Sequence, residues 1–387
     1  MALPSPAPML EGLQIVDLTS VLFGPFSTQL LGDLGADVIK VESPHGDTFR
    51  FVGKPARNRG MGPVHLALNR GKKSVALDLK RPDDLELMCA LLARADIFVH
   101  NVRAKAMQRL GLDYAAVKAI NPAIIYVHCV GFGSDGPYAD APAYDDVIQA
   151  ASGATSLPPR ADGNPQPRFI PSAIADKVAG LYAANAMLAA LLHRERTGEG
   201  QFVEVPMLET FTDFLLKEHL GGLTFDPPNG PPCYQRQIDP WRQPFPTADG
   251  HVCIVPYAED SWAKVMAVLG NPAILEDERF NTAAQRFRNT SLLYQEIAKL
   301  TPAQPTAYWI DALTKADIPV MGARDIADIL SEPHLAAVDF FAAEDHPTEG
   351  PYLRMKPPVH YGGYSYRERE PAAQLGGHGD AIRQALT

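Results

Sequence analysis

Asp176 is the side chain in this sequence with the clearest capacity for covalent chemistry. It begins a run of small and apolar residues, DKVAGLYAANAMLAALL, that has the spacing of an amphipathic helix. An aspartate at this place can act as the helix N-cap, which contributes about 1 kcal/mol to stability. It can also be a carboxylate that the helix N-terminus keeps ionised at the edge of a ligand cleft. The residues alone leave both roles open, and one residue can fill both.

Three polar residues follow predicted strands and form a second group of candidates. Lys80 ends the segment SVALDLK, Asn101 ends IFVHN, and Arg109 lies further on in RAKAMQRLGL. Ligands of parallel sheets bind at the carboxyl ends of the strands, so the shared position predicts contacts to a phosphate or a nucleotide. Taken singly, each residue is equally typical of a solvated surface. His100 and His128 lie inside apolar runs, and we predict packed core histidines there rather than catalytic bases.

Several common catalytic motifs are absent from the sequence. A G-x-G-x-x-G match begins at Gly131, but it runs into Pro137 instead of a helix, so we predict a turn and not a nicotinamide or flavin site. There is no P-loop and no G-x-S-x-G elbow. The eleven histidines form no H-x-x-x-H pair, which leaves a metal site without support.

Composition narrows the class of protein further. The net charge of −10 over 387 residues disfavours binding to nucleic acid or to an anionic membrane. The N-terminal residues lack the basic and apolar regions of a signal peptide, and no run of 18 apolar residues occurs. The four cysteines show no C-x-x-C spacing, which is typical of a reducing compartment. We therefore expect a cytoplasmic protein.

The elements that position these residues alternate in type along the first half of the chain. Strands are predicted at Leu13–Leu18, Asp37–Glu42, Ser74–Leu79, Ile97–Val102, Ile124–Val130 and Phe202–Val205. Helices are predicted from Pro25 to Gly35 and over Arg81–Ala95, Tyr144–Gly153, Asp176–Glu195 and Leu208–Leu220. This alternation predicts an α/β fold with a Rossmann-like parallel sheet and helices on both faces.

The composition of the chain changes at Phe225. Seven prolines occur within the 22 residues from Phe225 to Pro246, so we predict an extended linker. A smaller α+β unit follows, with a hairpin turn at Asp249-Gly250. Its helices are predicted at Ser261–Leu269, Leu292–Leu300 and Thr306–Lys315. The predicted domains are a large ligand-binding domain over residues 1–224, the linker over 225–246, a small domain over 247–335 and a C-terminal segment over 336–387.

Several long segments resemble the family III CoA-transferases, the CaiB/BaiF family, which includes formyl-CoA transferase and the α-methylacyl-CoA racemases. The matching segments are LEGLQIVDLTSVLFGPFSTQLLGDLGADVIKVESPHGDTFR, NRGKKSVALDLK, GFGSDGPYADAPAYDDVIQAASG, ADKVAGLYAANAMLAALLHRERTGEGQFVEVPMLE and HPTEG. They follow one another in order over nearly the whole chain. The resemblance implies an interlocked homodimer, in which extended linkers join the large and small domains and the C-terminal segment returns to the large domain.

The resemblance also assigns roles to single residues. It makes Asp176 the nucleophile, and it places Tyr144 near the thioester of the bound acyl-CoA. The implied contacts to CoA are Leu22, Phe23, Leu77, Lys80, Asn101, Val102, Arg109 and Tyr144. Ser43 stands where formyl-CoA transferase has an arginine that stacks on adenine, and Pro142 stands in place of a lysine. The Gly-rich loop of formyl-CoA transferase has no counterpart around Cys233–Pro246.

The implied reaction transfers CoA from an acyl-CoA to a small carboxylic acid through an aspartyl anhydride and an aspartyl-CoA thioester. CoA is then substrate and carrier, and no further cofactor is expected. A 2-methylacyl-CoA racemase is one alternative, although Tyr144 occupies the place of the racemase histidine. A CoA-binding protein without catalysis is another. Arg236 and Arg242 are candidates to hold a second substrate carboxylate, or they are surface arginines.

Overall fold

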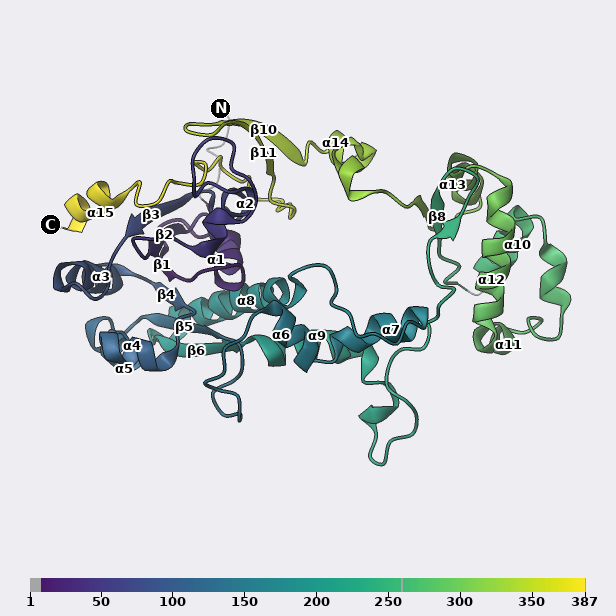
Figure 1. Ribbon diagram of the computed structural model, residues 1–387, viewed down its shortest axis with the longest axis horizontal. Helices are drawn as coiled ribbons and strands as arrows, with labels where there is room; N and C mark the ends of the chain where they lie inside the picture. The colour runs from purple at the N-terminus through teal and green to yellow at the C-terminus, as the bar shows by residue number, and fades with distance from the viewer. Residues whose placement is uncertain (1–7, 259, 387) are drawn as a thin grey trace. The chain divides into compact units, whose positions relative to one another are not determined.

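The computed structural model describes residues 8–258 and 260–386, which form two compact units (Figure 1). The first unit takes in the described residues up to Ala154, then Phe169–Leu216, and the chain from Leu335 onward. The second unit consists of Thr155–Arg168 and Lys217–His334. The first unit is therefore built from three separate stretches of the chain.

A six-stranded parallel sheet forms the centre of the first unit. Its strands are β1 (Gln14–Leu18), β2 (Asp37–Glu42), β3 (Lys72–Ala76), β4 (Ile97–His100), β5 (Ile125–Val130) and β6 (Gln201–Pro206). They lie in the order β3-β2-β1-β4-β5-β6, and every neighbouring pair is parallel. The predicted α/β fold with a parallel sheet is confirmed. The strand order reverses between β1 and β4, which is where ligands of such sheets bind.

Helices cover both faces of this sheet, as the labels in Figure 1 show. On one face, α1 (Phe23–Asp33) and α8 (Ile174–Thr197) pack with Ile15, Ile97 and Ile125 in one apolar core. On the other face, α3 (Pro82–Arg94), α5 (Tyr114–Ile120) and α15 (Gly379–Leu386) pack with Val16, Phe98 and Tyr126 in a second core. Successive residues of a strand point to opposite faces, so buried strands supply both cores.

Short elements complete the first unit, and all but one of them, the helix that lies within the predicted Tyr144–Gly153, were not predicted from the sequence. They are η1 (Thr48–Phe51), α2 (Pro63–Asn69), α4 (Ala104–Leu110), α6 (Asp145–Ala151, within a longer predicted helix), α14 (Pro333–Ala337, whose first two residues belong to the second unit), β10 (Phe341–His346) and β11 (Gly350–Met355). The two last strands form an antiparallel hairpin. The C-terminal segment is bonded to the sheet edge and to a covering helix: Gly71 N, just before β3, donates to Glu370 O at 2.7 Å, and Arg383 pairs with Asp84 of α3 at 2.8 Å.

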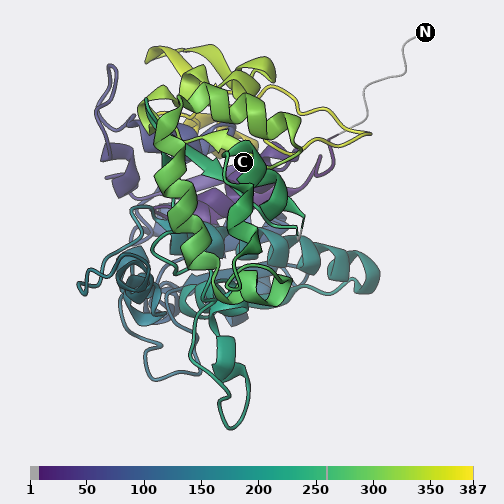
Figure 2. The same ribbon diagram turned by 90° about the vertical axis from the view of Figure 1, so that its right-hand side faces the viewer.

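The second unit combines a small antiparallel sheet with helices. The sheet contains β7 (Phe245–Pro246), β8 (His251–Ile254) and β9 (Val320–Gly322). The helices are α7 (Leu157–Asp162), α10 (Ser261–Val268), α11 (Ala283–Arg288), α12 (Thr290–Leu300) and α13 (Thr306–Lys315), most of which appear in green in Figure 2. The turn between β7 and β8 is the predicted one at Asp249-Gly250, closed by a bond from Thr247 N to Gly250 O at 2.9 Å.

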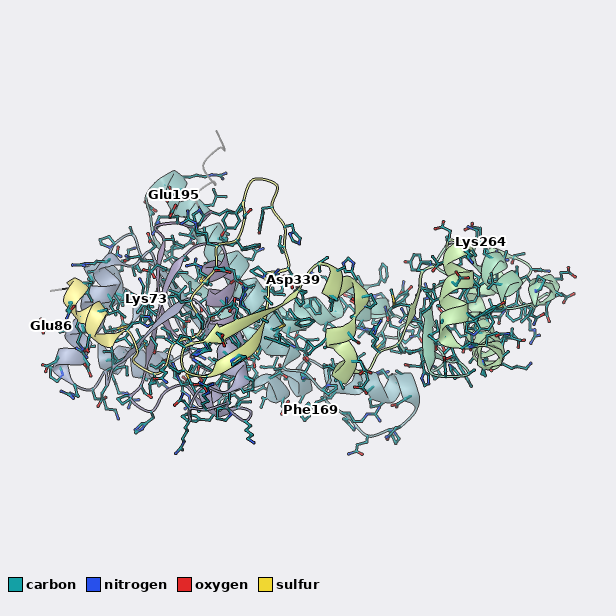
Figure 3. The ribbon with its side chains drawn as sticks, turned by 90° about the horizontal axis from the view of Figure 1, so that it is seen from above. Lys73, Glu86, Phe169, Glu195, Lys264 and Asp339 are labelled. Atoms are coloured by element: carbon teal, nitrogen blue, oxygen red, sulfur yellow. The ribbon has the colours of Figure 1, made fainter. Side chains whose placement is uncertain are left out.

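Long and apolar, α8 passes a length-and-composition test for a membrane-spanning helix, yet more than half of its most apolar stretch is buried inside the protein. This is typical of the core helix of a globular unit. Charged residues on the outer surface of the first unit include Glu86 on α3 and Glu195 near the end of α8, which are both exposed (Figure 3).

Candidate active site

Asp176 is the third residue of α8 and not its N-cap. The N-cap is Ala173, which makes no side-chain cap bond, and the helix begins at Ile174. Of the two roles that the residues left open for Asp176, that of helix N-cap is therefore excluded. The helix begins earlier because Ala175 is already buried in the core against the sheet. Only 6% of Asp176 is exposed, so its carboxylate lies in a nearly dry environment.

Asp145 and Gln149, both on α6, hold the chain at the start of α8. Asp176 N donates to Asp145 Oδ1 at 3.1 Å, and Gln149 Nε2 donates to Asp145 Oδ2 at 2.6 Å. The same Gln149 amide receives a bond from Ile170 N at 2.8 Å and donates to Ser172 O at 3.1 Å. This pair was not predicted from the sequence. Its four-residue spacing in DDVIQ was the available signal, because residues four apart lie on the same face of a helix.

Burial, and to a smaller extent the neighbouring Asp145 carboxylate, together raise the pKa of Asp176 to about 7. Among the residues that the structure describes, no cation pairs with the Asp176 carboxylate and no side chain is hydrogen-bonded to it. The expected effect of the helix N-terminus, to keep this carboxylate ionised, is thus outweighed. A carboxyl group that titrates near neutrality inside an apolar unit is a strong candidate for chemistry.

The point where the strand order reverses brings the next candidates together. Asn101, just after β4, bonds both backbone groups of Ser20, just after β1. Leu22 is the N-cap of α1, and Phe23 is the first residue of that helix, with its side chain in the core. A methyl group at Gly180 of α8 would lie 3.0 Å from Phe23 O, so α1 and α8 cross closely one turn beyond Asp176.

The other predicted CoA contacts differ in accessibility. Lys80 and Arg109 are exposed, and neither takes part in an ion pair with any described residue. Leu77 is buried, and its N–H donates to Glu42 O at 2.8 Å. Val102 O accepts a bond from His128 Nε2 at 3.0 Å. The two exposed cations are thus available to a phosphate.

A cavity of about 640 Å³ at the carboxyl ends of β4, β5 and β6 is lined by Asn101 and Tyr144, among others. The remaining predicted contacts and Asp176 are not among its lining residues. Tyr144 is 68% exposed. His100 and His128 stack with ring centroids 4.4 Å apart, and both are buried, which confirms them as packed core histidines. Burial holds the pKa of both rings below the usual value.

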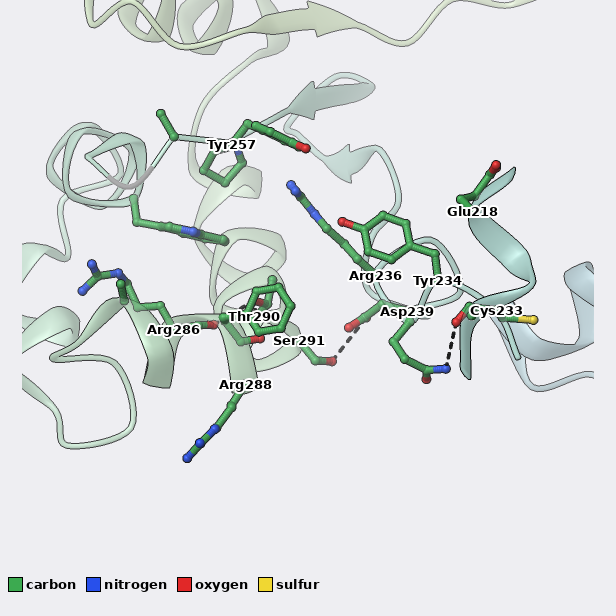
Figure 4. A pocket seen from close by; sticks show the side chains of 17 residues that line it. Glu218, Cys233, Tyr234, Arg236, Asp239, Tyr257, Arg286, Arg288, Thr290 and Ser291 are labelled. Carbon is green, nitrogen blue, oxygen red and sulfur yellow. Dashed lines mark hydrogen bonds between the residues drawn. The ribbon is translucent and has the colours of Figure 1, made fainter. Parts of the chain in front are cut away.

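The two candidate arginines of the Pro-rich segment do not meet in one site. Arg236 lines a pocket of about 600 Å³ in the second unit (Figure 4), where its guanidinium lies 5.0 Å from the Tyr257 ring centroid and Nε donates to Tyr294 Oη at 2.9 Å. Arg242 lies outside this lining and donates to Gln237 Oε1. Ser43 and Pro142, at positions of expected contacts, are exposed.

Comparisons with known proteins identify the family. Residues 10–379 match the model of CoA-transferase family III. The chain is 31% identical to succinate–glutarate CoA-transferase of Agrobacterium fabrum, over 97% of this chain and 95% of that protein. It is 33% identical to acetyl-CoA:oxalate CoA-transferase of Acetobacter aceti, with the same coverage. A crystal structure of a CaiB/BaiF family protein from Brucella suis superposes with a TM-score of 0.85 at 30% identity, over 99% of this chain and all of the other. The resemblance seen in the sequence is confirmed: the chain belongs to CoA-transferase family III, and it is a CoA-transferase.

Proposed function

We propose that this enzyme transfers CoA from an acyl-CoA thioester to a small carboxylic acid, with Asp176 as the nucleophile. The observation that carries the proposal is the placement of Asp176. Its carboxylate is buried at the start of α8, has a raised pKa and has no cationic partner among the described residues. A desolvated and unpaired carboxylate is a better nucleophile than one held by an ion pair.

The reaction balances without a redox or metal step. The Asp176 carboxylate attacks the thioester carbonyl, the C–S bond breaks, and CoA leaves as thiolate from a mixed anhydride. The thiolate then attacks the aspartyl carbonyl, which releases the donor acid as carboxylate and leaves CoA on Asp176. The acceptor carboxylate attacks this thioester to form a second anhydride, and the released thiolate takes the acceptor acyl group. Asp176 returns to its starting state.

The proposed CoA site uses the two exposed cations for phosphates and the start of α1 for the thioester end. Lys80 and Arg109 suit a pyrophosphate because charge-assisted bonds to phosphate are strong. Leu22, Phe23, Leu77, Asn101, Val102 and Tyr144 are the remaining proposed contacts. CoA serves as substrate and carrier, and we propose no further cofactor.

The acyl groups are proposed at the level of class. The similar enzymes named above act, by their names, on succinate, glutarate, acetyl-CoA and oxalate. A panel of acyl-CoA donors against mono- and dicarboxylic acids, read by mass spectrometry, identifies the pair of donor and acceptor.

We further propose an interlocked homodimer located in the cytoplasm. Light scattering at micromolar protein should give a mass near twice 42.0 kDa, and a fully active monomer would contradict the dimer.

Trapping with hydroxylamine tests the nucleophile directly. Incubation with acyl-CoA and then hydroxylamine should place a hydroxamate on the peptide that contains Asp176, because both covalent intermediates are acyl derivatives of that side chain. A modified peptide elsewhere, with Asp176 untouched, would refute the assignment.

An assay in deuterated water distinguishes the CoA-transferase from a racemase. We expect no deuterium at the α-carbon of 2-methylacyl-CoA, because Tyr144 supplies a phenol where the racemases have a histidine, and a phenol is a poorer base than an imidazole.

A further inference from the structure

Asn101 joins two strands across the point where the strand order of the sheet reverses. Its Oδ1 accepts a hydrogen bond from Ser20 N at 3.1 Å, and its Nδ2 donates to Ser20 O at 3.0 Å. The carbonyl and the NH2 group of the Asn101 amide thus bond to the N–H and the C=O of Ser20. The bond pair fixes the loop that follows β1 to the end of β4.

Buried charged side chains hold the same loop from the side of the sheet. Thr19 N donates to Asp17 Oδ1 at 2.9 Å, and Lys40 Nζ donates to Thr19 O at 3.0 Å. Val21 N donates to both carboxylate oxygens of Asp47, each at 3.1 Å, and Asp47 pairs with Lys40 at 3.3 Å. Five successive backbone groups, from Thr19 N to Val21 N, are therefore bound by side chains.

The conformation that these bonds hold is strained. Val21 has φ = 72°, in the left-handed region that β-branched residues strongly avoid. A non-glycine residue in such a region costs of order 1–3 kcal/mol and persists only where its surroundings impose it. Without the side chains that bind this loop, Val21 would relax to a negative φ and displace the residues that follow.

The residues that follow are the start of α1, which lies beside Asp176. The N–H groups of Leu22 and Phe23 have no hydrogen-bond partner among the described residues. Phe23 O and the Phe26 ring are in close contact with Gly180, one turn along α8 from Asp176. The position of the loop therefore sets the position of these two donors relative to the nucleophile.

We propose that Asn101 is a positioning residue for CoA transfer. It holds Val21 in its strained conformation and so aligns the start of α1, and the thioester bound there, with Asp176. This inference rests on the proposed function, in which Leu22 and Phe23 contact the acyl-CoA. The positioning role goes beyond the direct contact to CoA that the proposed function gives Asn101, because that contact alone would not depend on the conformation of Val21.

A double-mutant cycle between Asn101→Ala and Val21→Gly distinguishes the two roles. Glycine adopts φ = 72° without strain, so the loop needs the Asn101 bonds less once Val21 is replaced. We expect Asn101→Ala to lower kcat/KM about 10- to 100-fold in the Val21 background and about 3-fold or less in the Gly background. The loss should fall mainly on kcat, because alignment is lost while the phosphate contacts remain. Arg109→Ala is the matched control, and its loss should fall mainly on KM.

Hydrogen exchange of the peptide that contains residues 19–24 gives a second readout. Asn101→Ala should speed its exchange while the melting temperature stays within a few degrees of the wild type. If Asn101→Ala does not fold, the cycle is run with Asn101→Asp, which keeps the acceptor for Ser20 N, loses the donor to Ser20 O and adds a negative charge beside that carbonyl. If Asn101→Ala lowers kcat/KM equally in the protein with Val21 and in the Val21→Gly variant, and the wild type is active, the positioning role alone is overturned. A wild-type enzyme without CoA transfer would overturn the proposed function and this inference together.

Discussion

Asp17 and Asp176 are both buried aspartates of the first unit, and their surroundings are opposite. Asp17 is fully buried, but Lys72 lies 3.2 Å away, and the hydroxyls of Thr19 and Thr28 donate to its carboxylate. These partners outweigh the cost of burial and hold the pKa of Asp17 well below its usual value. Asp176 has a second carboxylate as its neighbour, and its pKa is raised to about 7.

The comparison shows that burial alone does not decide what a carboxylate does. Asp17 is tied to cations and hydroxyls, which makes it a fixed charge that organises the loop after β1. No side chain among the described residues is bonded to the Asp176 carboxylate, which leaves both carboxylate oxygens for a substrate. The same residue type is structural in one place and reactive in the other, because the neighbours differ.

The largest expected effect is on turnover at the reactive aspartate. Asp176→Asn should lower CoA transfer by at least about 1000-fold, because an amide cannot form the anhydride. The variant should fold and still bind CoA by calorimetry. Measurable transfer by purified Asp176→Asn, with deamidation excluded by mass spectrometry, would remove Asp176 from the mechanism.

The same substitution at the structural aspartate should act on stability. Asp17→Asn leaves Lys72 without its partner in a fully buried place, which costs about 3–5 kcal/mol for a broken buried ion pair. Chemical denaturation should show this loss, whereas Asp176→Asn serves as the control that removes a buried charge without breaking a pair. An Asp17→Asn variant as stable as the wild type would contradict the structural role of Asp17.

Ionisation of Asp176 and ionisation of Asp17 should change the stability of the fold in opposite directions as the pH rises. Because the pKa of Asp176 is raised in the folded state, its ionisation destabilises the fold as pH rises from about 4 to 7. Asp176→Asn should therefore be more stable than the wild type at pH 8, by on the order of 2–4 kcal/mol, and nearly equal to it at pH 4. Asp17 has a lowered pKa, so its contribution is present above about pH 4 and is lost as the solution becomes more acidic. Equal denaturation midpoints for Asp176→Asn and the wild type at pH 8 would count against the raised pKa.

The smallest expected effect tests the neighbour of the nucleophile. Only the ionised carboxylate attacks, so kcat/KM of the wild type should rise with pH through about 7. Asp145→Asn removes the second carboxylate, and the midpoint should move down by roughly one pH unit. An unchanged midpoint in Asp145→Asn would show that burial alone sets the pKa of Asp176.

Much of the central fold was predictable because its signals are local. β2 lies at the predicted residues, and β1, β4, β5, β6 and α13 lie within two residues of the predicted bounds. Each is an apolar run or a periodic pattern within a short window. The short helices α4 and α5 and the β10–β11 hairpin were missed, because few periodic positions define a helix of seven residues or a partly exposed hairpin.

The candidate site was less predictable, because it depends on contacts between residues far apart in the sequence. Asp176 was identified, but the two causes of its raised pKa, its burial in the folded unit and the carboxylate of Asp145 31 residues away, are not visible in the local sequence. The bonds from Asn101 to Ser20 span 81 residues. Such pairings follow from the strand order, which the local pattern of residues does not contain.

The three-part construction of the first unit has a consequence for how the protein is made. Residues from Leu335 onward belong to this unit, although the whole second unit is translated before them. During synthesis, the edge strand β3 therefore forms before the residues that bond to it, since Glu370 and His378, which bond to Gly71 and Ser74, are translated last. A nascent chain of 334 residues has the nucleophile and the β1 loop but lacks this final cover, and an exposed strand edge is a place where another chain can pair. The last fifty residues thus give the newly made chain its partner for that edge.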